Sequence, residues 1–308
     1  MQYLEVGIIA FIVTYILTPY LEKVGKKQNM VDIPNYRKIH EKAIPNLGGV
    51  AIFFGFLLSL LLGSQIDIQI KFLVAAGTLI LLLGIVDDIV DLSPRNKFLI
   101  QMLPALIVII SNQALIKNFM EGPLKSWGLL SYLIYPVLIF WIVGVTNSIN
   151  LIDGLDGLAC GISILAFLVF FILGIPQGLP SLNLVNLILA SSMLAFLRFN
   201  FFPAQIFLGD SGSTFSGFML ASSGVLWVLR SENLLYIFIP VMILFLPIFD
   251  TLWAIFRRFK NHQPIFQADK QHLHHRLLNR GISHKNAVLI LWAISAFFCL
   301  IALILVKM

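Results

Sequence analysis

NSINLIDGLDG, residues 147–157, lies between two long apolar runs and decides how the rest of the chain is interpreted. It contains two asparagines, two aspartates and two glycines, and no lysine or arginine. The glycines permit tight turns with positive φ, and the carboxylates can hold a metal ion or position a substrate. Because Asp-Gly is also a common turn dipeptide, an ordinary hairpin between membrane helices is the alternative interpretation. Asp153 and Asp156 lie where a bilayer-spanning segment would end, and acids recur at such positions elsewhere in the chain.

The composition is typical of a membrane protein, with 59% hydrophobic and 12% charged residues. Nearly uncharged runs long enough to cross a bilayer recur, so we predict an all-α, polytopic membrane protein with about ten transmembrane helices. The length fits one compact bundle, a single integral-membrane domain over residues 1–308. The predicted spans are 3–20, 47–64, 71–86, 98–112, 129–146, 158–174, 182–198, 212–230, 234–256 and 286–306.

Lysine and arginine concentrate in the connections from odd-numbered to even-numbered spans, by about three to one over the other side. These connections hold Lys23, Lys26, Lys27, Arg37, Lys38, Lys42, Arg95, Lys97, Arg198, Arg257, Arg258, Lys260, Lys270, Arg276, Arg280 and Lys285. The other side holds Lys71, Lys117, Lys125, Arg230 and Lys307. The bias predicts that the first set is cytoplasmic and that both termini lie outside.

Histidines and aspartates gather on the same predicted cytoplasmic side. They are His40, His262, His272, His274, His275, His284, Asp87, Asp88, Asp91, Asp153, Asp156, Asp210 and Asp269. A transporter is expected to carry polar groups near the middle of its spans, because its site lies at the midplane. Polar groups at one face favour an enzyme that works at the cytoplasmic interface.

Three aspartates, Asp87, Asp88 and Asp91, end the third predicted span. Asp87 and Asp91 are four residues apart and are predicted to share a helix face, with Asp88 pointing away. Adjacent carboxylates repel, so the cluster requires a cation, and hard oxygen ligands suit Mg²⁺. The alternative is a solvated helix end neutralised by Arg95 and Lys97.

The first basic loop, residues 21–46, ends in a Pro45-x-x-Gly48-Gly49 entry into the second span. Its lysines can bind an anionic substrate or lipid head groups. The two glycines permit a close approach of another backbone.

Phe207-Leu-Gly-Asp-Ser-Gly-Ser213 opens the eighth predicted span. The free amides of a helix start favour phosphate oxygens, and Asp210 can hold a metal. The alternative is a helix N-cap by Asp210 or Ser211, which is compatible with the first interpretation.

Asp250 lies about two turns before Arg257 and Arg258, where an acid needs a partner or a cavity. Pairing with an arginine and a direct catalytic role are both open.

The last basic loop contains a histidine run, since residues 269–276 have the sequence DKQHLHHR. Zinc is disfavoured there because no cysteine or further acid lies at the usual ligand spacing. Imidazoles beside Arg276 suit a diphosphate and a general acid role equally, and a solvated amphipathic loop is the alternative.

Five motifs in order resemble those of the polyprenyl-phosphate N-acetylhexosamine-1-phosphate transferases, which share their fold with the phospho-N-acetylmuramoyl-pentapeptide translocases. The resemblance covers nearly the whole chain. The motifs are Pro45-x-x-Gly48-Gly49, Asp87-Asp88-x-x-Asp91, Asn147-x-x-Asn150-x-x-Asp153-Gly154-x-Asp156-Gly157, Gly209-Asp210-Ser211-Gly212-Ser213 and His272-Leu273-His274-His275.

The resemblance implies that a sugar-1-phosphate moves from a UDP-sugar to a polyprenyl phosphate in the plasma membrane, with release of UMP. It implies a Mg²⁺ cofactor, for which Mn²⁺ is a possible substitute. Asp210 and Asp87 are the implied metal ligands. The implied catalytic residues, among which Asp87 is the candidate base, are Asp87, Asp88, Asp153, His272, His274 and His275. The implied substrate-binding residues, with Phe207 stacked on the uracil, are Lys42, Asn46, Asn147, Asn150, Asp156, Phe207 and Arg276.

The His272-Leu-His-His275 pattern is similar to that of the N-acetylglucosamine-type enzymes, whereas the muramoyl-pentapeptide enzymes carry three adjacent histidines after a proline. We therefore expect UDP-N-acetylglucosamine as donor and undecaprenyl phosphate as acceptor, in the first membrane step of an envelope polysaccharide. UDP-N-acetylgalactosamine, UDP-N-acetylfucosamine and UDP-N-acetylmuramoyl-pentapeptide are alternative donors.

An intramembrane prenyltransferase and a lipid transporter are the alternative classes of protein. A homodimer is compatible with the resemblance, and no nucleic-acid partner is expected.

Overall fold

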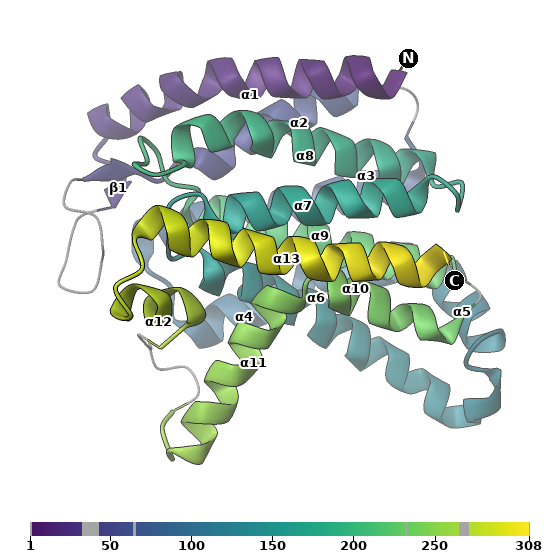
Figure 1. Ribbon diagram of the computed structural model, residues 1–308. Coiled ribbons are helices and arrows are strands. Elements are labelled where there is room, and N and C mark those ends of the chain that lie inside the picture. Colours follow the sequence, from purple (N-terminus) through teal and green to yellow (C-terminus); the bar gives the residue numbers. More distant parts are fainter. Residues whose placement is uncertain (1, 33–42, 64–65, 232, 265–270, 308) are drawn as a thin grey trace.

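The computed structural model describes residues 2–32, 43–63, 66–231, 233–264 and 271–307, and the predicted all-α class is confirmed (Figure 1). One short antiparallel pairing, β1 (Val31–Asp32) with β2 (Ile44–Pro45), flanks the first loop. The helices are α1 (Gln2–Lys27), α2 (Gly48–Leu62), α3 (Ile68–Val90), α4 (Pro94–Ser111), α5 (Gln113–Glu121), η1 (Lys125–Leu133), α6 (Ile134–Ile152), α7 (Leu158–Gly174), α8 (Pro180–Asn200), α9 (Gly209–Leu229), η2 (Leu234–Ile237), α10 (Phe238–Ile243), α11 (Phe245–Lys260), α12 (Leu273–Asn279) and α13 (His284–Lys307).

Each predicted span contains a helix, but a count of ten crossings is not confirmed. Among the described residues, six helices are long and apolar enough to cross a membrane. The count rises to eight if each of two bent helix pairs forms one span, and α2 and α7 are shorter apolar helices. The chain is therefore a polytopic membrane protein, and the number ten stays a prediction.

The α9 helix is the centre of the bundle, since its apolar window is entirely buried. It packs against α3 and α6 and also contacts α2 and α7. Glycine and serine residues line its first turns, and small residues let neighbouring helix backbones approach closely. An added Cβ at Gly84 of α3 would overlap the backbone of Ser211, and one at Gly49 of α2 would overlap Gly212. The close approach predicted for Gly48 and Gly49 is thus confirmed.

Two helix pairs are sharply bent. The α4 and α5 axes differ by 67°, and the segment 234–243 meets α11 at 84°. In Figure 1, α11 leaves the bundle and projects away from it. It exposes large apolar side chains to the surroundings, including Phe249, Trp253 and Phe256.

The two ends of the bundle differ. Figure 1 shows both chain termini at one end, while β1, α12 and the start of α13 lie at the other. The C-terminal end of α3 and the N-terminal end of α9 meet at this second end, so the predicted motifs converge there.

Candidate active site

Asp88, at the end of α3, caps the first turn of α9. Its Oδ1 accepts the backbone N–H of Asp210 at 2.8 Å, and its Oδ2 accepts that of Ser211 at 3.0 Å. The predicted N-cap by Asp210 or Ser211 is therefore wrong: the cap comes from a residue more than a hundred positions away in the chain. These two amides already donate to the Asp88 carboxylate, so they are not free to bind phosphate oxygens.

Gly209 makes this contact possible. It has φ of +74°, a conformation that costs glycine little. A Cβ added there would overlap the carbonyl oxygen of Asn46 and would lie 2.9 Å from Oδ2 of Asp88. Glycine at this position therefore lets the Asp88 carboxylate reach the helix start.

Asp87 and Asp210 share one cation, the ammonium group of Lys97 on α4. Lys97 Nζ forms an ion pair with Asp87 and lies 3.2 Å from Oδ2 of Asp210. The side chains of Asp87 and Lys97 are only 3% and 11% exposed, whereas that of Asp210 is 37% exposed. The solvated helix end neutralised by Lys97 is therefore not what the structure shows, because Lys97 belongs to a largely buried cluster.

The predicted pairing of Asp87 and Asp91 on one helix face is wrong. The α3 helix ends at Val90, and Asp91 takes a left-handed conformation with φ of +55°. Asp91 is exposed, while Asp87 is buried and accepts the N–H of Leu92 at 2.9 Å. The helix end thus separates the two carboxylates.

Asn150 of α6 orients Asp210. Its Nδ2 donates to Oδ1 of Asp210 and, at 2.8 Å, to the hydroxyl of Ser213, and its Oδ1 accepts from Lys97 at 3.4 Å. The nucleotide-facing role expected for Asn150 stays a prediction, and what the structure shows is a link among α4, α6 and α9. Asn147, one turn earlier, donates to Gln101 of α4 and to the carbonyl of Val143.

The loop between α6 and α7 carries the two Asp-Gly pairs. Asp153 ends α6 and is half-buried, and burial together with the carboxylates of Asp210, Asp156 and Asp88 raises the pKa of Asp153 to about 8. Asp156 accepts the backbone N–H of Ala204 at 2.9 Å and donates its own N–H to Nε2 of His284 at 3.0 Å. Asp156 therefore ties this loop to the α8–α9 connection and to α13.

The histidine run begins at a buried acid. Nδ1 of His272 lies 2.8 Å from Oδ2 of Asp250, and the N–H of Leu273 donates to Oδ1 of Asp250 at 2.9 Å. His272 and the Leu273 amide are thus partners of Asp250, and the pairing with an arginine stays a prediction.

His274 is buried and packs on the α6–α7 loop. A Cβ added at Gly154 would overlap Nε2 of His274, so the ring lies directly against the Gly154 backbone. Burial and the neighbouring His275 and His272 lower the pKa of His274 to about 3, which keeps the imidazole neutral at physiological pH. The rings of His274 and His275 lie 4.3 Å apart, and Arg276 is exposed.

The first loop adds a backbone contact to the α9 entry. Phe207 donates its N–H to the carbonyl of Pro45 at 2.7 Å and accepts from Gly48 at 3.0 Å. Asn46 and Phe207 are half-buried beside the Asp88 cap. Lys42, also predicted to bind substrate, lies outside the described residues.

The oxygen donors fit a magnesium ion better than a zinc ion. Oδ2 of Asp87 and Oδ2 of Asp210 both face the ammonium group of Lys97, so two carboxylate oxygens already surround one cationic atom. In the described part of the chain, no group of three or more His, Cys, Asp or Glu side chains is arranged to hold a metal. Mg²⁺ commonly uses one or two protein carboxylates and completes its shell with water and phosphate oxygens, whereas a structural zinc site needs four protein ligands.

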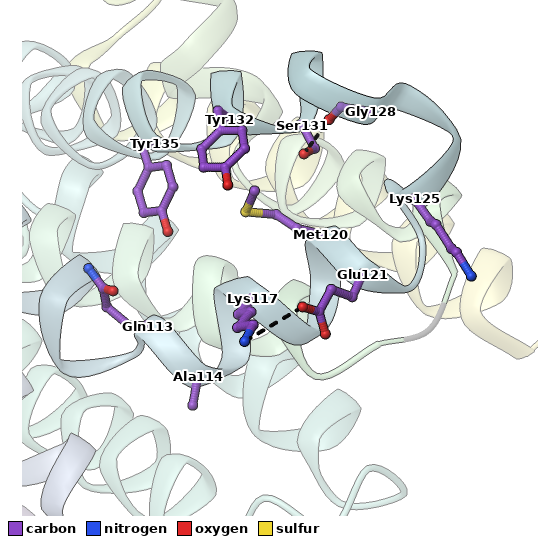
Figure 2. Close-up of a pocket in the computed structure, with 10 residues that line it drawn as sticks. All are labelled: Gln113, Ala114, Lys117, Met120, Glu121, Lys125, Gly128, Ser131, Tyr132 and Tyr135. Carbon is purple, nitrogen blue, oxygen red and sulfur yellow. Dashed lines mark hydrogen bonds and ion pairs between the residues drawn. The ribbon is translucent and has the colours of Figure 1, made fainter.

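A pocket of about 490 Å³ lies elsewhere, between α5, η1 and the start of α6 (Figure 2). Lys117 and Glu121 form an exposed ion pair in it, opposite Tyr132 and Tyr135. Its lining includes no residue of the predicted site. The polar cluster at the α3 and α9 ends is therefore the better candidate for chemistry.

Comparisons with known proteins match the part of the chain that contains this polar cluster. The family model described as glycosyl transferase family 4 matches residues 70–228, which include Asp87, Asp153 and Asp210. The "Probable undecaprenyl-phosphate N-acetylglucosaminyl 1-phosphate transferase" of Bacillus subtilis is 39% identical over 97% of this chain and 84% of its own length. A Thermotoga maritima relative named "Undecaprenyl-phosphate alpha-N-acetylglucosaminyl 1-phosphate transferase" is 32% identical over 95% of this chain and 87% of its own length. The "Decaprenyl-phosphate N-acetylglucosaminephosphotransferase" of Mycobacterium tuberculosis is 31% identical over 93% of this chain and 78% of its own length.

Proposed function

The chain belongs to glycosyl transferase family 4, and on this basis we propose that it transfers N-acetylglucosamine 1-phosphate to a polyprenyl phosphate. The names of the curated relatives support this reaction, and both undecaprenyl and decaprenyl acceptors occur among them. One structural observation carries the proposal: Asp87, Lys97, Asn150 and Asp210 converge from four helices within the matched region.

We propose UDP-N-acetylglucosamine as the donor and undecaprenyl phosphate as the acceptor. An oxygen of the lipid phosphate attacks the sugar-bearing phosphorus, the bond between the two donor phosphates breaks, and UMP leaves. The product is a lipid diphosphate sugar. Phosphoryl transfer of this kind depends mainly on positioning and on neutralising charge. A lipid phosphate monoester is already largely ionised at neutral pH, so the base role of Asp87 is secondary to its role in charge balance.

Asp210 and Asp87 would hold Mg²⁺, for which Mn²⁺ can substitute. The ion would supply charge neutralisation at the donor diphosphate when bound. Asp210 is the more exposed of the two carboxylates and therefore the one open to an incoming ligand. Asn150 and Asp88 hold Asp210 from two directions, one through its side chain and one through its backbone.

Lys97 balances the charge of Asp87 and Asp210 and lies close enough to Asn150 to contribute to the same site. The Asp153 carboxyl interacts electrostatically with those of Asp210 and Asp88, and His274 packs on the neighbouring Gly154, so we place the histidine run beside the site. We assign the diphosphate contacts to His274, His275 and Arg276. Asn46, Asn147, Asp156 and Phe207 stay candidates for nucleotide contacts, with Phe207 beside the α9 entry.

A site at one end of the bundle suits a reaction between a water-soluble donor and a lipid-dissolved acceptor. We propose that this end faces the cytoplasm from the plasma membrane and that the two termini lie outside, as the lysine and arginine distribution predicts. Both termini lie at the opposite end of the bundle, which agrees with that arrangement. Family membership argues against the prenyltransferase and transporter classes, while another UDP-N-acetylhexosamine and a homodimer stay open to test.

The proposal is tested with purified protein in detergent, undecaprenyl phosphate, Mg²⁺ and a panel of UDP-sugars. We expect UMP release with UDP-N-acetylglucosamine and its loss when EDTA is added. Release with a different UDP-sugar alone would change the donor, and release that EDTA does not affect would contradict the metal assignment. The absence of UMP with every donor, from folded protein, would overturn the proposed reaction.

A further inference from the structure

Asp250 and His272 form a buried pair that the sequence patterns did not reveal. Asp250 lies on α11 and His272 directly precedes α12, and their relative exposures are 3% and 5%. Oδ2 of Asp250 lies 2.8 Å from Nδ1 of His272. A buried carboxylate is costly unless close polar groups bind it, so Asp250 depends on its contacts with His272 and Leu273.

The contact determines which nitrogen of His272 carries the proton. When the Asp250 carboxylate is ionised it only accepts hydrogen bonds, so this contact then requires Nδ1 of His272 to donate. In the neutral ring Nε2 then has a free lone pair, and in the charged ring both nitrogens donate. Asp250 thus leaves Nε2 as the nitrogen that can accept or deliver a proton.

The same carboxylate fixes the start of α12. Its Oδ1 accepts the N–H of Leu273, the first residue of that helix. The ring of His272 lies parallel to that of His274, with centroids 5.8 Å apart and planes 3° apart. His274 in turn lies against Gly154, on the loop that carries Asp153. Asp250 therefore connects α11 through α12 to the acidic loop of the candidate site.

We propose that Asp250 is a positioning residue for the transfer reaction: it holds His272 with its proton on Nδ1 and fixes α12, so that the histidine run meets the substrate phosphates in one arrangement. This inference rests on the proposed function. It explains why an acid is placed in α11 without a direct part in the chemistry.

The first test uses Asp250→Asn. The asparagine carbonyl can still accept the N–H of Leu273, but its amide group would face Nδ1 of His272 and favour the other tautomer. We expect a stable protein whose kcat falls by roughly tenfold or more, with an altered pH profile and a small change in KM for the donor. Asp67→Asn is the matched control, because Asp67 is exposed and precedes the start of α3, at the opposite end of that helix from the cluster.

The second test asks whether Asp250 acts through His272. In a His272→Asn background, Asp250→Asn is expected to cause no further loss of kcat, since the partner is already gone. Losses that multiply would show that Asp250 acts independently and would overturn the proposal. An Asp250→Asn protein with wild-type kcat and pH profile would also overturn it.

Nitrogen-15 NMR of histidine-labelled protein tests the pair without relying on activity. The His272 signal is identified by its loss in His272→Asn. The wild-type ring should show a protonated Nδ1, and Asp250→Asn should move the proton to Nε2. If the ring is unchanged in Asp250→Asn, the proposal fails. UMP release by the wild type is measured first, so that failure of the transferase function is recognised separately from failure of the pair.

Discussion

The carboxylate of Asp88 accepts the backbone N–H groups of Asp210 and Ser211, and this contact joins the end of α3 to the start of α9. It holds the Asp210 backbone in place while Asn150 and Lys97 hold the Asp210 side chain. The position of the most exposed carboxylate in the cluster is therefore fixed from three neighbouring helices.

Asp88→Ala should weaken both the fold and the reaction. It removes the acceptor of two helix-start amides, a loss of about 1–2 kcal/mol. The thermal unfolding midpoint in detergent should fall, and transfer should be nearly abolished because Asp210 is displaced. Asp67→Ala serves as the control and should behave as the wild type, because Asp67 is exposed and its side chain caps no helix. A normal midpoint and turnover for Asp88→Ala would refute the capping role.

Lys97→Met should destabilise the protein strongly in the absence of divalent cations. It leaves Asp87 and Asp210 without their shared cation, and breaking a buried ion pair costs about 3–5 kcal/mol. Adding Asp87→Asn should recover part of this loss, since one buried charge is then removed. Added Mg²⁺ should raise the unfolding midpoint of Lys97→Met more than that of the wild type. If Mg²⁺ raises the unfolding midpoints of Lys97→Met and the wild type equally, the ion does not bind to these carboxylates.

Gly154→Ala should disturb catalysis while leaving most of the bundle intact. The new Cβ would overlap the His274 ring, so the histidine run must move away from the acidic loop. Misplacement of this order can lower the rate by roughly 100-fold. Gly144→Ala is the matched control, because no heavy atom lies within 4 Å of a Cβ added there. If both variants retain wild-type UMP release, the contact has no role in turnover.

Acid should destabilise the protein partly through His274. Its pKa is about 3 in the folded state, against an ordinary value of 6.5. Between these values the unfolded chain binds a proton that the folded protein does not, so this stabilising contribution is fully present above pH 6.5 and is lost as the pH falls toward 3. His274→Asn should therefore show a smaller drop in unfolding midpoint between pH 7 and pH 4.5. An unchanged drop would contradict the buried, neutral imidazole.

The helical class was predictable from the sequence, and so was the gathering of the polar motifs at one end of the bundle, because apolar runs and polar interruptions are local properties of the chain. The Asp-Gly stretch at 153–157 and the Gly48-Gly49 entry both lie where the patterns indicated. Helix ends were less predictable. Asp91 has the right spacing to share a face with Asp87, but the helix stops one residue before it.

Contacts between distant residues could not be read from the sequence. The Asp88 cap, the ion pairs of Lys97 and the pairing of Asp250 with His272 each depend on how helices pack. One signal was present for Lys97: three acids shortly before it required a nearby cation. No comparable pattern linked Asp250 to a histidine 22 residues later, across the α11–α12 connection.

The most direct test of the central claim compares UMP release by the wild type, Asp210→Asn and Asp210→Ala, with equal amounts of folded protein. The substrates are UDP-N-acetylglucosamine and undecaprenyl phosphate, with Mg²⁺ or with EDTA. We predict metal-dependent release by the wild type and a loss of roughly 100-fold or more in both variants. Turnover by either variant at the wild-type rate would contradict the assignment of the α3–α9 cluster as the transfer site.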